Sequence, residues 1–569
     1  MRRTTLIAFL LLSALPISSQ QPVHTEPPLY VTAIDLIVDV RDGSGKLPAG
    51  LTPADFVLVE DGVERKIIGI DYLRAEREKA TAAQTAAAPG ATSRPVMPGA
   101  QKLWQTVLYF ETQLSGTMGR QRIATELSNQ VDTLVQMGTV DVVLADPTPT
   151  ALVRNSRDPQ AIRDALGKVA GHQGVNQLVA HRRRYMRERH EIASLADIKR
   201  NSPKATKVEM EEMGARAGGK ARVDMDAGGE IVLADTGAKT VRPYIDEEMQ
   251  LINRFRTNLL TWVSNYRRHI PRTLVVVTDG FDLDPLDFYS SNLNQGDEVS
   301  LRSHVAQYAV ADAATKMSSA LAASGWTTIS VPADNAYTEG WNDDASISGI
   351  GRAHKTVTTP GNRKNTKAYL YSPIDPLNLM ALETGGAVVA NSSKLGGVVQ
   401  GLDERVRITY QVDRKPDGKA RKVEVRPRNN KLRVKSAQWA SSSTPDEMAD
   451  ARALNLLNAG GFAGELPVKA SIAWGSAPGR RKGMLEASMN VAEIKQLLPA
   501  GAKGDFRFTL AIRVPEKGGF VTNHIISGYK LDEGVFRVKT PVDFPEGTSA
   551  VAVVIEEINT SLWGSAKIE

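Results

Sequence analysis

The chain contains no cysteine among its 569 residues. Disulfide bonds, thiolate metal ligands and cysteine nucleophiles are therefore excluded. A chain without disulfides must be held together by packing alone. For an exported protein, this is more typical of a bacterial periplasm or exterior than of a eukaryotic ectodomain.

Catalytic motifs are also missing. There is no Gly-x-Ser-x-Gly elbow, and His190-Glu191 lacks the second histidine of a zinc-protease helix. The eight histidines are scattered, and an isolated histidine is more often a surface or hydrogen-bonded residue than a ligand. We therefore expect a protein that is not an enzyme.

The chain has little excess charge of either sign. Its formal charge is +6, and it falls to +4 if Arg2 and Arg3 are removed with a leader. This excess is too small to indicate a nucleic-acid partner. With 42% hydrophobic and 24% charged residues, the composition is that of a globular protein, and the length predicts two to four domains.

No hydrophobic run reaches the roughly 20 residues that a membrane span needs. The longest one, Leu6 to Leu15, follows Arg2-Arg3 and precedes Pro16 to Gln20. This order predicts a signal peptide over residues 1–20, and the alternative is an uncleaved anchor. We expect an exported protein, periplasmic or extracellular in a Gram-negative-type bacterium, with no membrane span after removal of the signal.

The rest of the chain divides by pattern into four parts. Residues 21–74 are β-like with a hairpin at Asp61-Gly62, and 75–101 form an Ala/Thr/Pro linker. Residues 102–440 alternate strands and helices, which predicts a Rossmann-like parallel sheet with helices on both faces. Residues 445–569 alternate apolar and polar positions, which predicts an Ig-like β-sandwich. Three polar insertions interrupt the α/β part near 170–242, 282–300 and 334–369.

Two apolar runs end abruptly in polar residues. Gln105 to Phe110 runs into Glu111 to Met118, and Arg272 to Val277 runs into Thr278-Asp279-Gly280. Runs of this kind are typical of buried parallel strands, whose carboxyl ends share one edge of a sheet. We therefore expect an oxygen-lined crevice at this edge.

Divalent cations such as Mg²⁺ prefer hard oxygen ligands, and Mg²⁺ takes six of them. Glu111, Ser115 and Asp279 are the candidate ligands at the two strand ends. Thr150 and Ser156 are alternative candidates from the next loop.

The order of several short motifs resembles the von Willebrand factor A (vWA) domain, more narrowly the VWFA-related domain of acidobacterial exported proteins. The resemblance covers about residues 30–440 and rests on the following segments: Asp55 to Gly62, Thr278-Asp279-Gly280, Thr384-Gly385-Gly386 and Arg407 to Val412. It implies a vWA-type sheet and a metal-ion-dependent adhesion site that begins with Asp-x-Ser-x-Ser.

This chain departs from that motif. It has Glu111-x-Gln113-x-Ser115, in which only Ser115 matches, and Asp279 matches the later aspartate. The resemblance therefore implies a degenerate site for Mg²⁺, Mn²⁺ or Ca²⁺. The alternative is structural, with Asp279 capping the following turn and Ser115 capping the following helix.

Three further segments resemble binding sites, but each also has a simpler interpretation without a ligand. The acidic cluster Asp279, Asp282, Asp284 and Asp287 is either a Ca²⁺ loop or a solvated loop. The basic run His181 to His190 is either a docking site for an anionic partner or a solvated helix. Gly214 to Ala221 nearly matches a phosphate-binding loop, but Ala221 replaces the required hydroxyl.

The resemblance implies non-catalytic recognition of a protein or cell-surface ligand through loops 111–118, 146–156 and 279–287. One alternative is a structural envelope component that assembles through its β domains. Another is a hydrolase that uses the carboxylates of 282–287.

Overall fold

The computed structural model describes residues 32–74, 104–188, 224–225, 231–232, 238–264, 266, 271–290, 295–333, 374–442, 445–459, 464, 466–475, 480–498, 501–514, 518–532, 534–560 and 562–568.

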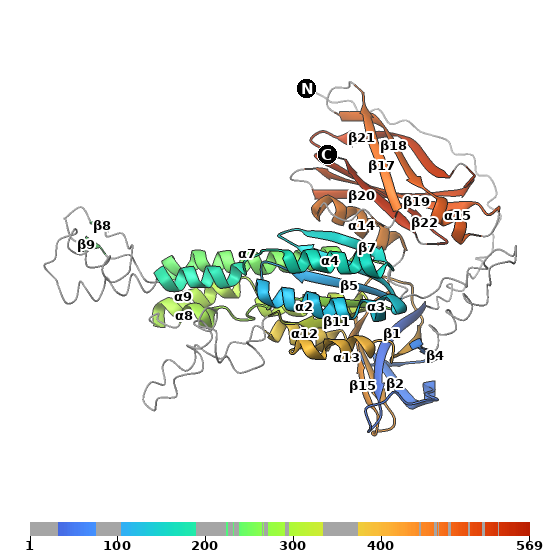
Figure 1. Cartoon of the computed structure of the whole chain (residues 1–569). Helices are drawn as coiled ribbons and strands as arrows, with labels where there is room; N and C mark the ends of the chain where they lie inside the picture. Colours follow the sequence, from blue (N-terminus) through green and yellow to red (C-terminus); the bar gives the residue numbers. More distant parts are fainter. Residues whose placement is uncertain are drawn as a thin grey trace, which may run out of the picture.

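A six-stranded sheet lies at the centre of the molecule (Figure 1). Its strands, in spatial order, are β12 (Ala387–Val388), β11 (Trp326–Val331), β10 (Arg272–Val277), β5 (Trp104–Glu111), β6 (Gly138–Ala145) and β7 (Pro149–Ser156). All neighbouring pairs are parallel except β6 and β7, which form an antiparallel hairpin. Every residue of β5 and β10 is buried, because helices cover both faces. The predicted mostly parallel sheet flanked by helices is confirmed.

Two helical layers enclose this sheet. One layer contains α2 (Thr117–Asn129), α3 (Val131–Met137), α4 (Pro159–Gly171), η4 (Ser392–Lys394) and α13 (Leu395–Gln400). The other contains the helix over 177–188, α7 (Ala238–Val263), α8 (Leu286–Ser290), α9 (Gln295–Ala306), α10 (Val310–Ala323) and α12 (Asp375–Glu383). Helix α4 begins at the predicted place, where the Asp158 side chain accepts a hydrogen bond from the Gln160 amide. Within the described residues, none of the helices is both long and apolar enough to cross a membrane.

The N-terminal strands do not form a region of their own. They are β1 (Thr32–Arg41), β2 (Phe56–Glu60), β3 (Val63–Arg65) and β4 (Ile67–Tyr72), with a 3-10 turn, η1 (Pro53–Asp55). They pair with β13 (Val406–Val412), β14 (Arg421–Pro427), β15 (Arg433–Ser436) and β16 (Trp439–Ala440). The resulting sheets, β15-β1-β13-β4 and β16-β14-β2-β3, enclose one apolar core. Residues 406–440, which the sequence analysis counted with the α/β part, thus complete a sandwich with residues 32–72.

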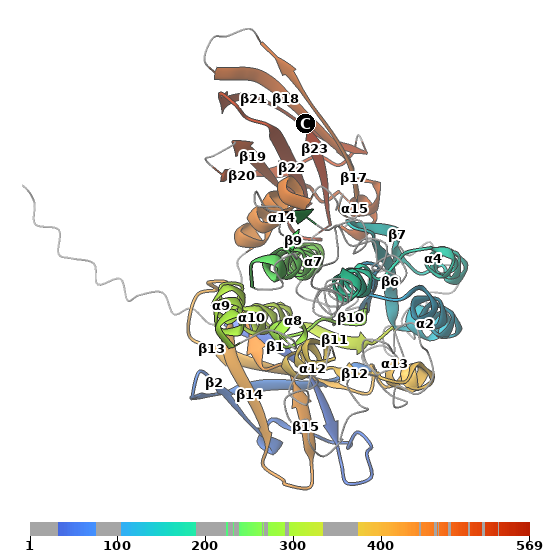
Figure 2. The same ribbon diagram turned by 90° about the vertical axis from the view of Figure 1, so that its left-hand side faces the viewer.

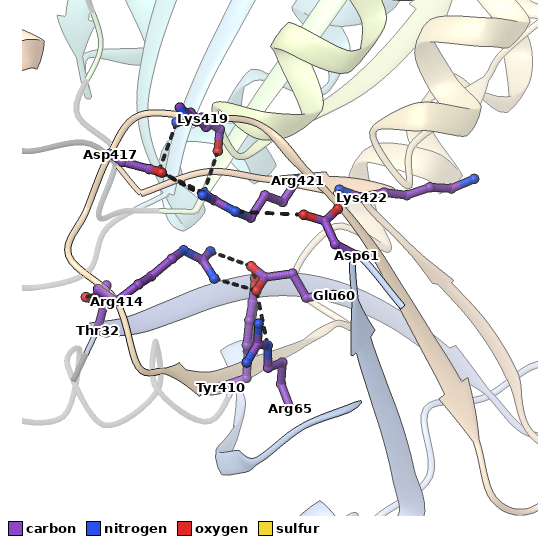
Figure 3. Close-up of polar contacts among 10 residues, drawn as sticks. All are labelled: Thr32, Glu60, Asp61, Arg65, Tyr410, Arg414, Asp417, Lys419, Arg421 and Lys422. Carbon is purple, nitrogen blue, oxygen red and sulfur yellow. Dashed lines mark hydrogen bonds and ion pairs between the residues drawn. The ribbon is translucent and has the colours of Figure 1, made fainter. Parts of the chain in front are cut away.

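A buried ion cluster fastens this sandwich at one end (Figure 3). Glu60 is fully buried at the end of β2, and both of its oxygens accept hydrogen bonds from Arg414 at 2.6 Å. Burial alone would raise the pKa of Glu60, but the hydrogen bonds and charge of Arg414 outweigh it and hold the pKa below its usual range. Arg65 and the Tyr410 hydroxyl donate to the same carboxylate, both at 3.2 Å. The cluster ties the β2–β3 hairpin to the end of β13.

The C-terminal part differs from the predicted sandwich. One sheet contains seven strands: β17 (Leu466–Trp474), β18 (Arg480–Asn490), β19 (Gly504–Val514), β20 (Gly518–Tyr529), β21 (Val535–Pro545), β22 (Ala550–Glu557) and β23 (Trp563–Ile568). Their order, β20-β19-β22-β23-β17-β18-β21, is unbroken. The helices α14 (Pro445–Ala459) and α15 (Ala492–Leu497) accompany this sheet, and a separate two-stranded ribbon pairs β8 (Asp224–Met225) with β9 (Ile231–Val232).

The reason for this difference is strand length. β18 and β21 pair over eleven residues, and long twisted strands curl one sheet around its own core instead of splitting it in two. The edge strands approach each other at one end. There the ring centroids of Phe506 on β19 and Phe536 on β21 stack at 3.9 Å, and the Tyr529 hydroxyl at the end of β20 donates to the Val535 carbonyl of β21. The sheet is nearly closed.

Helix α14 joins the curled sheet to the α/β part, and Figure 2 shows it between the sheet and α7. Its residues Ala453, Leu456 and Leu457 share one buried cluster with residues of α7 such as Phe255. These two parts of the molecule therefore have a common core.

Candidate functional site

The two polar strand ends meet at the carboxyl edge of the central sheet. β5 and β10 are adjacent and parallel, so their following loops are neighbours. The Asp279 amide donates to the Leu114 carbonyl at 2.8 Å, and the Gly116 amide donates to Asp279 Oδ2 at 2.9 Å. These two bonds join Asp279 to the residues before and after Ser115, so the two candidate ligands lie close together.

Glu111 is not poised as a ligand. It is 1% exposed, and one carboxyl oxygen accepts the Gln113 amide at 3.0 Å. The other oxygen has no hydrogen-bond partner within the described residues. Burial, with a smaller contribution from the charge of Asp146, raises the pKa of Glu111 to about 8. Glu111 is therefore mostly a neutral acid at pH 7, and a neutral acid is a poor ligand for a cation.

Ser115 and Gln113 direct their polar atoms into the protein. The Ser115 hydroxyl donates to the Glu111 carbonyl, which closes a turn at the strand end. The Gln113 side-chain oxygen accepts from Arg254 at 3.3 Å. Contrary to the structural alternative, Ser115 does not cap α2, because Gly116 is the N-cap residue and no hydroxyl caps it. The carboxylate of Asp279 accepts the Gly116 amide at this end of the helix.

A guanidinium lies where the crevice oxygens converge. Arg120 on α2 is fully buried and donates to the Ser115 carbonyl at 2.8 Å and to the Ser115 hydroxyl at 3.2 Å. It also faces the carboxyl groups of Asp279, Asp146 and Glu111. A permanent positive charge from the chain itself therefore compensates this cluster of acids.

Thr150 and Ser156 are separated by the hairpin geometry. Thr150 pairs with Leu144 near the carboxyl end of β6, and its side chain is exposed. Ser156 pairs with Val140, five residues from Ala145 at the carboxyl end. At about 3.3 Å per strand residue, Ser156 lies about 16 Å from the crevice. The expectation that Ser156 joins the site is wrong, because β7 runs antiparallel to β6.

The residues at this edge do not fit a bound Mg²⁺, Mn²⁺ or Ca²⁺. Six candidates were proposed: Glu111, Gln113, Ser115, Thr150, Ser156 and Asp279. Of these, Glu111, Gln113 and Ser115 lie close together, but their side-chain polar atoms bond to the protein itself and do not converge with Asp279. In the part of the chain that the structure describes, no three His, Asp or Glu side chains are grouped to hold a metal ion. Six-coordinate Mg²⁺ needs more converging oxygens than this edge supplies, and Arg120 already lies among them.

An insertion covers the crevice. The Asn176 side-chain amide donates to Asp279 Oδ2 at 3.1 Å, and the Gln177 amide donates to the Gln113 carbonyl at 2.7 Å. The Thr117 hydroxyl donates to the Gly174 carbonyl. Because of this cover, Ser115 is 0% and Asp279 6% exposed.

The basic run lies on the helix over 177–188 and fits the solvated-helix interpretation only in part, because Arg184 and Arg187 are exposed but other members are not. His181 and Arg182 are buried, so this part of the run is neither a solvated face nor open to an anionic partner. Arg182 donates to both oxygens of Glu248 on α7 and, at 2.7 Å, to Asp282. The Tyr289 hydroxyl completes the network by donating to Glu248 at 2.8 Å. Residues 189–190 lie outside the described residues.

The acidic cluster also contains both buried and exposed side chains. Asp282 is 3% exposed and paired with Arg182, so it belongs to no solvated loop or Ca²⁺ loop. Burial raises the pKa of Asp282 to about 8, although the charge of Arg182 acts in the opposite direction. Asp284 accepts the Leu286 amide at 3.1 Å at the start of α8. The Asp287 side chain and Gly214–Ala221 lie outside the described residues.

Sequence reasoning missed Arg120, Asn176 and Glu248. A signal for Arg120 exists, because it lies three, four and seven residues before Ile123, Ala124 and Leu127 on the buried stripe of α2. An arginine on such a stripe needs an internal acceptor. Asn176 and Glu248 have no comparable signal, since their partners are distant in sequence.

Two comparisons with known proteins found no relative of this chain. No protein-family model matches the chain, and a search of curated proteins finds no match.

Proposed function

We propose that this chain is an exported, non-enzymatic binding protein that recognises a protein or cell-surface ligand at the carboxyl edge of its central sheet. The observation that carries the proposal is an exposed apolar pair on a rigid polar base. Met118 is 78% and Val175 71% exposed, and they directly follow Thr117 and Gly174, whose hydrogen bond joins the two segments. Large exposed apolar groups rimmed by polar residues are typical of interaction sites.

The rim surface comprises Met118, Asp146, Thr148 and Val175, all at this edge. Its base is rigid, because Arg120, Asp279 and Asn176 connect the loops beneath it through buried and partly buried hydrogen bonds. A preorganised surface loses little entropy on binding. Since the positive charge beneath it belongs to Arg120, recognition requires no divalent cation.

A photo-crosslinking experiment tests this proposal. A benzophenone amino acid is placed at Met118 or, as a control, at Val63, which is 51% exposed on the distant sandwich. We expect a discrete adduct in producing cells from position 118 that persists in EDTA and disappears when Val175 is changed to Asp. No adduct from position 118, or one lost in EDTA, contradicts the proposal.

A structural envelope component is a second candidate, and β20 favours it. This twelve-residue edge strand contains no Lys, Arg, Asp, Glu or Pro, and Phe520 and Ile525 are 50% and 57% exposed. The opposite edge, β21, carries Arg537, Lys539 and two prolines. Charges and prolines protect edges from strand addition, so β20 is the edge suited to pairing with another strand.

The absence of native cysteine makes this second candidate easy to test. A single His524→Cys substitution on β20 gives disulfide-linked neighbours if the strand pairs with another copy, whereas Lys539→Cys on β21 gives none. A monomeric His524→Cys protein under oxidising conditions counts against assembly through this edge.

The hydrolase alternative gains no support from the described carboxylates. Asp282 is engaged by Arg182, and Asp284 caps α8, so each has a structural role.

A further inference from the structure

The outer face of three strands in the C-terminal part is open to solvent. On β17, β18 and β21, alternate residues such as Ile472, Ala487 and Phe536 pack into the core inside the curled sheet. The residues between them therefore point away from that core. Helix α14 packs over β19, β20 and β22, whereas β18 and β21 lie on the side away from α7 (Figure 2). The side chains on the outer face of β17, β18 and β21 are thus accessible to a ligand.

Two pairs of charges on this face are balanced across neighbouring strands. Lys482 on β18 is opposite Asp543 on β21, and Glu486 on β18 is opposite Lys539 on β21. Opposite charges in such cross-strand positions stabilise a sheet. These two pairs therefore have a structural explanation that needs no ligand.

One row of the same face carries two cations and no acid. Ser488 on β18 is opposite both Lys469 on β17 and Arg537 on β21. Lys469 and Arg537 are exposed, and neither side chain forms an ion pair or a hydrogen bond within the described residues. The Ser488 hydroxyl is partly exposed and also has no hydrogen-bond partner there. In the described part of the chain, three donors on adjacent strands thus lack an acceptor.

The spacing of this row suits one small anion. Neighbouring strands are about 4.8 Å apart, so the α-carbons of Lys469 and Arg537 lie about 10 Å from each other, with Ser488 between them. Both side chains are long enough to incline toward Ser488. An ammonium group and a guanidinium group have donors only and no acceptor. The row therefore favours an oxyanion over a cation or a neutral group.

The charge of the row indicates which oxyanion fits. A carboxylate carries one negative charge, whereas a phosphate monoester carries about −1.5 to −2 at pH 7. The two cations of the row match the phosphate monoester. An arginine fork pairs with two phosphate oxygens at once, and a lysine binds phosphate as a point charge. Both side-chain types of the row are therefore suited to this group.

We propose that Lys469, Ser488 and Arg537 form a binding site for a phosphate monoester. The Arg537 guanidinium donates to two of the phosphate oxygens, Lys469 donates to the third, and the Ser488 hydroxyl donates from the middle of the row. The phosphate belongs either to a soluble ester or to a lipid headgroup such as that of phosphatidic acid, which share this chemistry. The site is independent of the rim surface, because it lies in the C-terminal part.

Titration calorimetry of the full chain with glycerol 3-phosphate tests the proposal, and acetate at the same ionic strength is the control for a single negative charge. We expect saturable binding of glycerol 3-phosphate and none of acetate. Flotation with phosphatidylcholine vesicles that contain phosphatidic acid distinguishes the two sources. Flotation of the chain with these vesicles identifies the lipid, whereas binding of glycerol 3-phosphate without flotation identifies a soluble ester.

Matched variants on this one face locate the binding. Lys469→Gln and Arg537→Gln each remove one charge and should weaken binding about tenfold or more, and Ser488→Ala should weaken it about threefold. Lys482→Gln and Lys539→Gln remove the balanced cations and should change binding by about twofold or less. Circular dichroism should be the same for all five variants.

Three results overturn the proposal. The first is that neither glycerol 3-phosphate nor the phosphatidic-acid vesicles bind. The second is that acetate binds as tightly as glycerol 3-phosphate. The third is that Lys482→Gln weakens binding as much as Lys469→Gln, which would mean that only the general charge of the face attracts the anion.

Discussion

At the scale of single residues, the decisive group is Arg120. A buried arginine is tolerated only where oxygens and opposite charges surround it, and the loops after β5 and β10 supply both. The meeting of Ser115 and Asp279 could be predicted, because parallel strand ends share an edge. The guanidinium beside Ser115 was missed although its place on the buried stripe of α2 was a signal, because the resemblance to a metal site directed attention to oxygen ligands alone.

The first prediction concerns Glu111. Its folded-state pKa of about 8 lies well above the ordinary 4.5, so between these values the folded chain holds a proton that the unfolded chain has lost. The stabilising effect of that proton is complete below pH 4.5 and disappears as the pH rises through 8. Glu111→Gln removes this dependence. Relative to the variant, the wild-type free energy of unfolding should fall by about 1.4 kcal/mol per pH unit between pH 5 and 8.

Chemical denaturation at several pH values measures this difference. Glu298→Gln on the exposed surface of α9 is the control and should follow the wild type. Parallel curves for the wild type and Glu111→Gln would show that Glu111 is ionised in the folded protein.

At the scale of elements, the helix over 177–188 is the main departure from the sequence-based interpretation. Its basic residues and the acids after β10 each have the composition of a solvated segment. In the fold, Arg182 contacts both Glu248 and Asp282 in the interior. Local composition cannot reveal such a pairing, because the partners are distant in sequence and come from different elements.

The second prediction uses two arginines of this helix. Arg182→Leu leaves Glu248 and Asp282 without their cation and should lower the free energy of unfolding by about 3–5 kcal/mol. Arg184 pairs with Glu247 at the surface, where both side chains are more than 40% exposed, so Arg184→Leu should cost about 1 kcal/mol or less.

Hydrogen exchange gives the local readout of this prediction. Arg182→Leu should accelerate amide exchange over 177–188 before the rest of the chain. Equal effects of the two variants would mean that the buried network does not anchor the helix.

Local sequence patterns could not place two other parts of the fold either, for the same reason. Period-two alternation correctly predicted strands after 466, but it carries no information on whether seven strands form one sheet or two. The sequence analysis treated residues 146–156 as a loop, whereas residues 149–156 form β7, and the hairpin of β6 with β7 places Ser156 at the far end of the sheet.

At the scale of the whole molecule, the sandwich is closed by strands from both sides of the α/β part. β1 pairs with β13 over seven residues, from Thr32–Val412 to Val38–Val406. Sequence position alone suggested an independent N-terminal region. The third prediction is that removal of residues 32–74 takes β1, β2 and β4 away from β13, β14 and β15, so the remaining chain should be insoluble or should lose its cooperative thermal transition in calorimetry. Normal unfolding of the shortened chain would contradict this dependence.

The fourth prediction concerns the C-terminal part. Because α14 shares a buried cluster with α7, removal of residues 445–569 exposes apolar side chains of α7 such as Trp262. We expect the shortened chain to bind the dye ANS and to aggregate, whereas the full chain should do neither. A soluble, monomeric, ANS-negative fragment would show that the common core is dispensable.

Titration calorimetry of the full chain with Mg²⁺, Mn²⁺ and Ca²⁺ tests most directly whether Arg120 supplies the positive charge of the crevice. We expect no saturable heat from the wild type with any of the three ions, since the guanidinium already compensates Asp279. One saturable site in the wild type that is lost in Asp279→Ala would contradict this account.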